Sequence, residues 1–69
     1  MRFMCKFKAE RIIKETLTKT HCRFLTSELE DGLLKVWFLD VKGNCQKGIF
    51  PYRYMNESEV IDRVMEVIF

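Results

Sequence analysis

Cysteine and histidine are the side chains of this sequence best suited to bind a metal ion or to attack a substrate. The chain has three cysteines and one histidine, at Cys5, His21, Cys22 and Cys45. Short structural zinc sites usually take two thiolates from a Cys-x-x-Cys turn, and this spacing does not occur here. In a strand, His21 and Cys22 would point to opposite faces, so they could not both ligate one ion. We therefore expect no metal site and three free thiols, as is typical of a reducing intracellular setting.

Catalytic sets are missing as well. A lone histidine without a glycine-framed serine gives no triad, and direct adjacency of His21 and Cys22 is poor geometry for a base and its nucleophile. Residues 43–48 lack the Gly-Lys-Ser/Thr ending of a phosphate-binding loop. The acidic side chains in the middle of the chain surround expected turns, where they would be solvated: Glu28, Glu30, Asp31 and Asp40. We expect a protein that is not an enzyme and that needs no cofactor.

Charge is unevenly distributed along a chain whose net charge is only +2. Residues 1–26 carry seven basic side chains against two acidic ones, whereas residues 27–41 carry four acidic side chains against one basic. The sign changes twice more, to basic over 42–54 and to acidic over 55–69. A patchwork of this kind is typical of a solvated surface, and so small a net charge does not by itself imply a nucleic-acid partner.

Length limits the chain to one domain, which we expect to cover residues 1–69. The longest apolar run, residues 36–39, has four residues. A membrane span needs roughly 20 apolar residues. Near the start, Arg2 and Lys6 interrupt any apolar stretch, so no secretory signal is expected. These features predict no membrane association and a cytoplasmic location.

The two ends of the sequence have distinct periodicities. Phe3, Cys5 and Phe7 alternate with other side chains, which predicts a strand over residues 2–7. From residue 9 onward the apolar and threonine positions follow helical spacing and predict a helix over 9–20: Ala9, Ile12, Ile13, Thr16, Leu17 and Thr20. Near the other end, Asn56 and Glu59 form a capping-box pattern ahead of a second helix over 57–68.

Two turn signals divide the middle of the chain into strands. Asp31-Gly32 is a strong hairpin signal because both residues tolerate positive φ, and residues 42–44 (Lys-Gly-Asn) mark a second turn. The expected strands are 22–30, 33–41 and 45–54, with Pro51 at an edge or a break. The fold class is α+β: a small two-layer sandwich of order β-α-β-β-β-α, or α-β-β-β-α. Its antiparallel sheet would have three or four strands, with both helices on one face.

The strand over 33–41 carries apolar side chains on both of its faces, which is typical of a strand buried on both sides. Two short helices cover one face of a sheet and little more. We expect Leu34, Val36 and Phe38 to face the helices, and Trp37 and Leu39, with Lys35, to lie on the open face. The alternative is that the sheet curls until the helices and termini bury both rows.

An uncovered apolar face with aromatic side chains indicates a binding surface. The sequence therefore predicts a small non-enzymatic intracellular protein that binds another protein or itself, a homodimer included. Its size suits an accessory regulator or inhibitor of the kind that mobile elements encode. The expected contact residues lie on the middle and last strands: Lys35, Trp37, Leu39, Tyr52 and Tyr54.

The alternative prediction is a nucleic-acid-binding module. An α-β-β-β-α order resembles, at the level of layout, the double-stranded-RNA-binding domains, which place lysines at the start of their last helix. Here that position, residues 55–59, is acidic, so the resemblance does not extend to the residues that grip phosphates. Sheet aromatics could instead stack single-stranded bases beside basic side chains. The candidate contacts are Lys14, Lys19, Arg23, Lys47 and Arg53.

Overall fold

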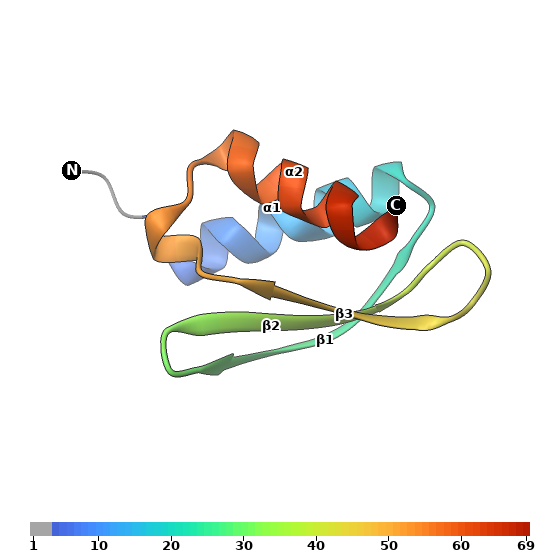
Figure 1. The fold of residues 1–69 in the computed structure, drawn as a ribbon, viewed down its shortest axis with the longest axis horizontal. Coiled ribbons are helices and arrows are strands. Elements are labelled where there is room, and N and C mark those ends of the chain that lie inside the picture. The colour runs from blue at the N-terminus through green and yellow to red at the C-terminus, as the bar shows by residue number, and fades with distance from the viewer. Residues whose placement is uncertain (1–3) are drawn as a thin grey trace.

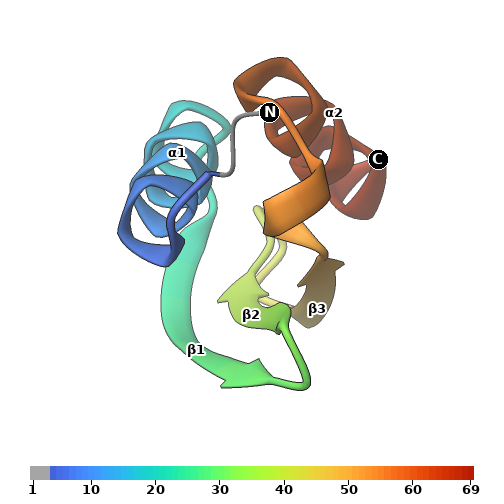
Figure 2. The same cartoon turned by 90° about the vertical axis from the view of Figure 1, so that its left-hand side faces the viewer.

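The computed structural model describes residues 4–69 and shows an α+β fold with a three-stranded antiparallel sheet (Figure 1). The elements follow in the order α1 (Lys6–Lys19), β1 (Arg23–Glu30), β2 (Leu33–Leu39), β3 (Cys45–Phe50), the 3-10 helix η1 (Tyr52–Tyr54) and α2 (Glu57–Ile68). The sheet order is β1-β2-β3, so β2 is central. Both helices lie on one side of the sheet, and no described element covers the other side (Figure 2).

Helix α1 begins at Lys6, three residues earlier than predicted. Cys5 caps it, because the Cys5 Sγ accepts a hydrogen bond from the Lys8 backbone N–H at 3.4 Å. The predicted strand over 2–7 is therefore wrong at Lys6 and Phe7, while residues 2–3 lie outside the described residues. The predicted helical stripe is confirmed for five of its six members, which are buried: Ala9, Ile12, Ile13, Thr16 and Leu17. The sixth, Thr20, is the C-cap of the helix and is half-buried.

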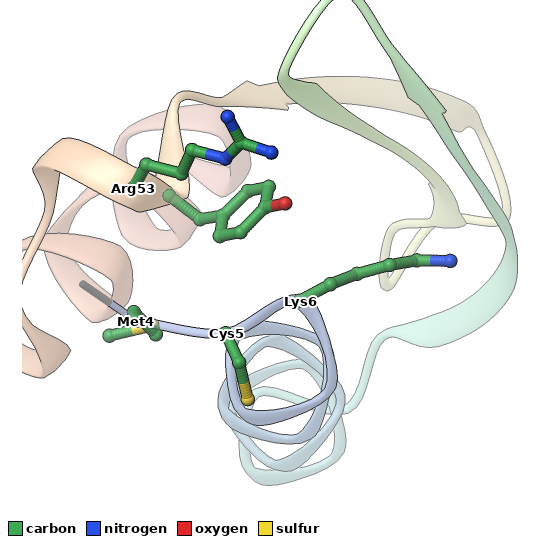
Figure 3. Close-up of a pocket in the computed structure, with 5 residues that line it drawn as sticks. Met4, Cys5, Lys6 and Arg53 are labelled. Atoms are coloured by element: carbon green, nitrogen blue, oxygen red, sulfur yellow. The ribbon is translucent and has the colours of Figure 1, made fainter.

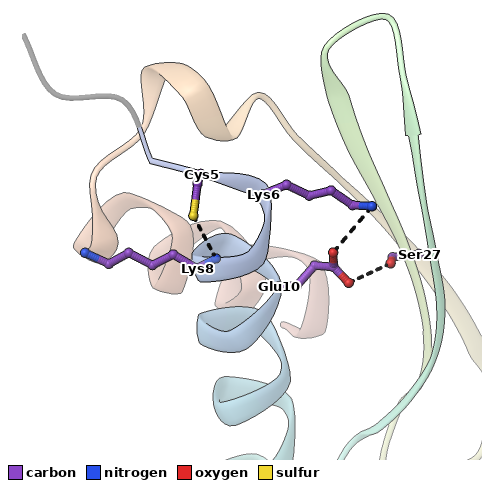
Figure 4. Close-up of polar contacts among 5 residues, drawn as sticks. All are labelled: Cys5, Lys6, Lys8, Glu10 and Ser27. Carbon is purple, nitrogen blue, oxygen red and sulfur yellow. Dashed lines mark hydrogen bonds and ion pairs between the residues drawn. The ribbon is translucent and has the colours of Figure 1, made fainter.

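A polar contact joins the first half of α1 to β1 (Figure 4). The Ser27 Oγ donates a hydrogen bond to the Glu10 carboxylate at 3.1 Å. The Lys6 Nζ lies 3.7 Å from the same carboxylate. This contact links α1 directly to β1.

The end of α1 is built without glycine. His21 takes the left-handed conformation, with φ of 62°. Its N–H donates to the Thr18 C=O at 3.1 Å, and the Cys22 N–H donates to the Leu17 C=O at 2.8 Å. This pair of bonds is a Schellman motif, which satisfies the last helical carbonyls and turns the chain into β1.

Both predicted turns are present. Asp31 and Gly32 have φ of 52° and 75°, and Glu30 pairs with Leu33, as a two-residue hairpin requires. In the second turn the Asp40 carboxylate accepts N–H bonds from Lys42 and Asn44, both at 2.9 Å.

The strand predicted over 45–54 is too long. It ends at Phe50, because Pro51 has no N–H to donate and the chain turns there into η1. Tyr52 consequently enters the core and is 4% exposed. The strand predicted over 33–41 likewise ends at Leu39, ahead of the Asp40 turn.

Helix α2 has the predicted bounds and the predicted capping box. The Glu59 N–H donates to Asn56 Oδ1 at 2.9 Å, and the Asn56 N–H donates to Glu59 Oε1 at 3.0 Å. Its buried residues, Val60 and Val64, join the core between the helices and the sheet. On β3, Gly48 leaves room for the Phe50 ring, since a Cβ at position 48 would lie 2.8 Å from that ring.

Candidate binding surface on the open sheet face

The side of the sheet away from the helices is the candidate functional surface, called here the open face. Along β2 the side chains alternate between buried and half-buried. Leu34, Val36 and Phe38 are buried under the helices, as predicted. Trp37 and Leu39 lie on the other side with Lys35 and are half-buried. The alternative, in which the sheet curls until the helices and termini bury both rows, does not occur in the described chain, since only the row facing the helices is buried.

Strand register places Trp37 in the middle row of the open face. Its partners across the sheet are Thr26 on β1 and Lys47 on β3. Residues directly opposite each other in an antiparallel sheet share a face, so all three side chains lie together. The Lys47 ammonium is 5.4 Å from the centroid of the Trp37 ring, within reach of a cation–π contact. The aromatic ring is thus held beside one flanking cation.

The next row pairs Lys35 with Glu28 and Ile49. Lys35 also forms an ion pair with Glu30. The hydrogen bond from Lys35 lowers the pKa of Glu30, and the same bond raises the pKa of Lys35. Both groups therefore stay charged at neutral pH, and Lys35 is oriented across the sheet.

Apolar side chains on either side of these rows enlarge the surface. Leu39 pairs with Arg23 and Cys45, and Leu33 pairs with Glu30. Ile49, beside Lys35, is 41% exposed. Ile49 and Leu33 were not predicted as contact residues; alternation along β3 and β2 could have identified them once the strand bounds were known.

Two of the predicted contact residues lie elsewhere. Tyr52 is in the core, so the expectation that it belongs to an exposed aromatic stripe is wrong. Tyr54 is 82% exposed but belongs to η1 and not to the sheet. The cause in both cases is the break at Pro51, after which the period of a strand no longer applies.

The predicted nucleic-acid contacts are all exposed and are spread over four elements, α1, β1, β3 and η1: Lys14, Lys19, Arg23, Lys47 and Arg53. The Lys14 ammonium lies 4.6 Å from the centroid of the Phe24 ring, on the helical side of β1. Lys47 is on the open face. η1, which carries Arg53, and the end of α1, which carries Lys19, are at opposite ends of the molecule (Figure 1).

Thiols and acids do not gather into a metal-binding set within residues 4–69. Cys5 and Cys45 are exposed, whereas Cys22 is buried, and all three are free thiols. Within the same residues, neither helix has the length and apolar character to cross a membrane.

Comparisons with protein families, with curated proteins and with solved structures find no match to this chain.

Proposed function

We propose that this chain is a small non-enzymatic regulator or inhibitor that acts by binding another protein through the open face. One observation carries the proposal. Trp37 lies half-buried in the central strand, on a sheet face that no described element covers. Because tryptophan is enriched among the residues that dominate binding energy, this position is the natural centre of a contact.

The surroundings of Trp37 support a protein partner. Leu39, Leu33 and Ile49 supply apolar area near the ring, and charged side chains of both signs flank it, among them Lys47 and Glu28. An apolar centre with a mixed polar rim is the usual composition of a protein–protein interface. A strongly basic face would instead favour a nucleic acid.

The test compares Trp37→Ala with Tyr54→Ala. Both changes remove a large aromatic side chain, but only the first removes it from the open face. Tagged protein is returned to its source cells, and the proteins that co-purify are identified by mass spectrometry and then measured in pairwise binding. A genuine partner should bind the wild type and Tyr54→Ala alike and bind Trp37→Ala at least about tenfold more weakly, as expected for a central aromatic.

The fold of the variant decides how a loss of binding is interpreted. Trp37→Ala should keep its far-ultraviolet circular dichroism and cooperative unfolding, since the side chain is outside the buried cluster. An unfolded Trp37→Ala variant would place the ring among the side chains that hold the fold together, and the proposal would then fail.

Self-association is a form of the same proposal, with a second copy as the partner. Because Trp37 is the only tryptophan, its fluorescence reports on the open face alone. If a homodimer forms through this face, the emission should shift and acrylamide quenching should fall as concentration rises. Sedimentation should show the mass doubling over the same range, and Trp37→Ala should remain monomeric.

A nucleic-acid-binding module is the second candidate. The observation that favours it is that none of its five proposed cations forms an ion pair within residues 4–69. Their separation over several elements favours it less, because a phosphate backbone is tracked by a continuous basic groove. If this candidate is correct, binding to single-stranded RNA should weaken steeply with salt, and replacing Lys14, Lys19 and Arg23 by glutamine should flatten that dependence.

A further inference from the structure

A pocket of about 460 Å³ opens between the start of α1 and η1 (Figure 3). Its lining comes from two distant parts of the chain: Met4, Cys5, Lys6, Tyr52 and Arg53. It is a shallow hollow, largely open to solvent, and its volume is enough for one small organic group. Since η1 and α1 both stand on the helical side of the sheet, this pocket is separate from the open face.

Tyr52 brings a phenol hydroxyl to the pocket. The residue is 4% exposed, and its hydroxyl makes no hydrogen bond with any residue of the described part, 4–69. Within that part no side-chain oxygen or nitrogen is both enclosed and without a partner. Tyr52 is one of the five residues that line the pocket. A ligand oxygen there would accept a hydrogen bond from this hydroxyl, for which residues 4–69 offer no acceptor.

The rim of the pocket is cationic. Figure 3 shows Arg53 and Lys6 extending on opposite sides of the opening, with the Cys5 sulfur directed away from both. The Lys6 Nζ forms an ion pair with the Glu10 carboxylate at 3.7 Å, whereas Arg53 forms no ion pair within residues 4–69. The first turn of α1, which begins here, has no acidic side chain to offset the positive end of its dipole.

The remaining wall is apolar. Met4 is part of the buried core cluster, and the Tyr52 ring is packed into the same cluster. A bare inorganic anion would leave this wall without a partner. A ligand with a negatively charged group and an apolar body would satisfy both the rim and the wall.

We propose that this pocket binds an organic carboxylate. The Arg53 guanidinium pairs with the carboxylate, the Tyr52 hydroxyl donates a hydrogen bond to it, and the apolar body lies against Met4. Arginine suits this role because its planar fork can engage both oxygens of one carboxylate. The carboxylate belongs either to a free small acid or to the C-terminus of a peptide, since both present the same group.

The probe is benzoate, and the control is benzamide, which has the same ring and a neutral amide in place of the carboxylate. The full chain is titrated with each compound while the Met4 methyl, the Tyr52 ring and the Trp37 indole are followed by nuclear magnetic resonance. Benzoate should shift the Met4 and Tyr52 signals saturably and leave Trp37 unchanged, and benzamide should bind at least about tenfold more weakly, because it lacks the charge. A parallel titration with N-acetyl-glycyl-phenylalanine distinguishes the two sources. Tighter binding of this peptide acid than of benzoate would identify a peptide C-terminus, and weaker binding would identify a free acid.

Variants connect the signal to the named groups. Arg53→Gln should weaken benzoate binding by about tenfold or more, and Tyr52→Phe, which keeps the buried ring, by several-fold. Lys19→Gln removes one positive charge at the other end of α1 and should have no effect. Absence of saturable shifts at Met4 and Tyr52, equal binding of benzamide, or an equal effect of Lys19→Gln and Arg53→Gln would each overturn the proposal. None of these outcomes bears on the open face, whose test is the Trp37 variant.

Discussion

Asp40 is a single side chain on which the whole β2–β3 turn depends. One carboxylate oxygen accepts the N–H groups of Lys42 and Asn44, and the other accepts the Gln46 amide at 3.1 Å. The backbone bond from Asn44, followed by the side-chain bond from Gln46, lowers the pKa of Asp40 from its ordinary value of 3.8. The ionised carboxylate is therefore the form that the folded turn prefers.

This preference predicts a specific acid sensitivity. A carboxyl group whose pKa is lowered by folding stabilises the protein above its ordinary pKa, and the contribution is lost as pH falls through the lowered value. Denaturant unfolding of wild type and Asp40→Asn should differ most at pH 5 and above, and the difference should shrink steadily toward pH 2. Asp62→Asn, a change on the exposed surface of α2, serves as the control. A difference between wild type and Asp40→Asn that stays constant from pH 5 to pH 2 would contradict this prediction.

At the scale of elements, the end of α1 offers a stabilising substitution. The Schellman motif requires the left-handed conformation at position 21, where glycine is the usual residue. For histidine this conformation is strained, because the Cβ lies close to the following carbonyl oxygen. His21→Gly should raise the free energy of unfolding by about 0.5–1 kcal/mol, after allowance for the extra freedom of glycine in the unfolded chain. His21→Ala keeps the Cβ and should leave the denaturation midpoint nearly unchanged. If glycine and alanine have the same effect, the conformation of His21 is not a source of strain.

Elements with both a periodic pattern and an end signal were predictable from the sequence. The second helix has a capping box and an apolar stripe, and its bounds are confirmed at 57–68. The Asp31-Gly32 hairpin is confirmed for the same reason. The first strand was wrong at Lys6 and Phe7 because the alternation at Phe3, Cys5 and Phe7 covers too few residues to outweigh the helix, which already includes Lys6.

The candidate site was predictable only where its residues lie inside a strand. Trp37, Leu39 and Lys35 follow from alternation along β2, and their common side is confirmed. Tyr52 and Tyr54 were misplaced because the strand was extended through Pro51, although a break there was one of the two possibilities considered, and Pro51 does end the strand. The pocket beside η1 could not be foreseen, since its walls meet only in the folded chain.

At the scale of the whole molecule, one core must hold both layers together. The buried cluster includes Leu34 from β2, Leu17 from α1 and Val60 from α2, so no element has a core of its own. A chain of this length has only about 3–10 kcal/mol of stability, at 0.05–0.15 kcal/mol per residue. A single cavity should therefore affect every element at once.

Two adjacent leucines of β2 test this directly. Leu34 is fully buried, whereas Leu33 is half-buried on the open face. Leu34→Ala should cost about 2–5 kcal/mol through lost burial and the cavity left behind, and Leu33→Ala less than about 1 kcal/mol. In denaturant, Trp37 fluorescence reports on the sheet and far-ultraviolet circular dichroism mainly on the helices. Both signals should move to lower denaturant together in Leu34→Ala, because the two layers share that core. If the helical signal persists after the tryptophan signal is lost, the two layers unfold separately and the prediction fails. If Leu33→Ala and Leu34→Ala lower the free energy of unfolding by similar amounts, the open face is buried as deeply as the helical side.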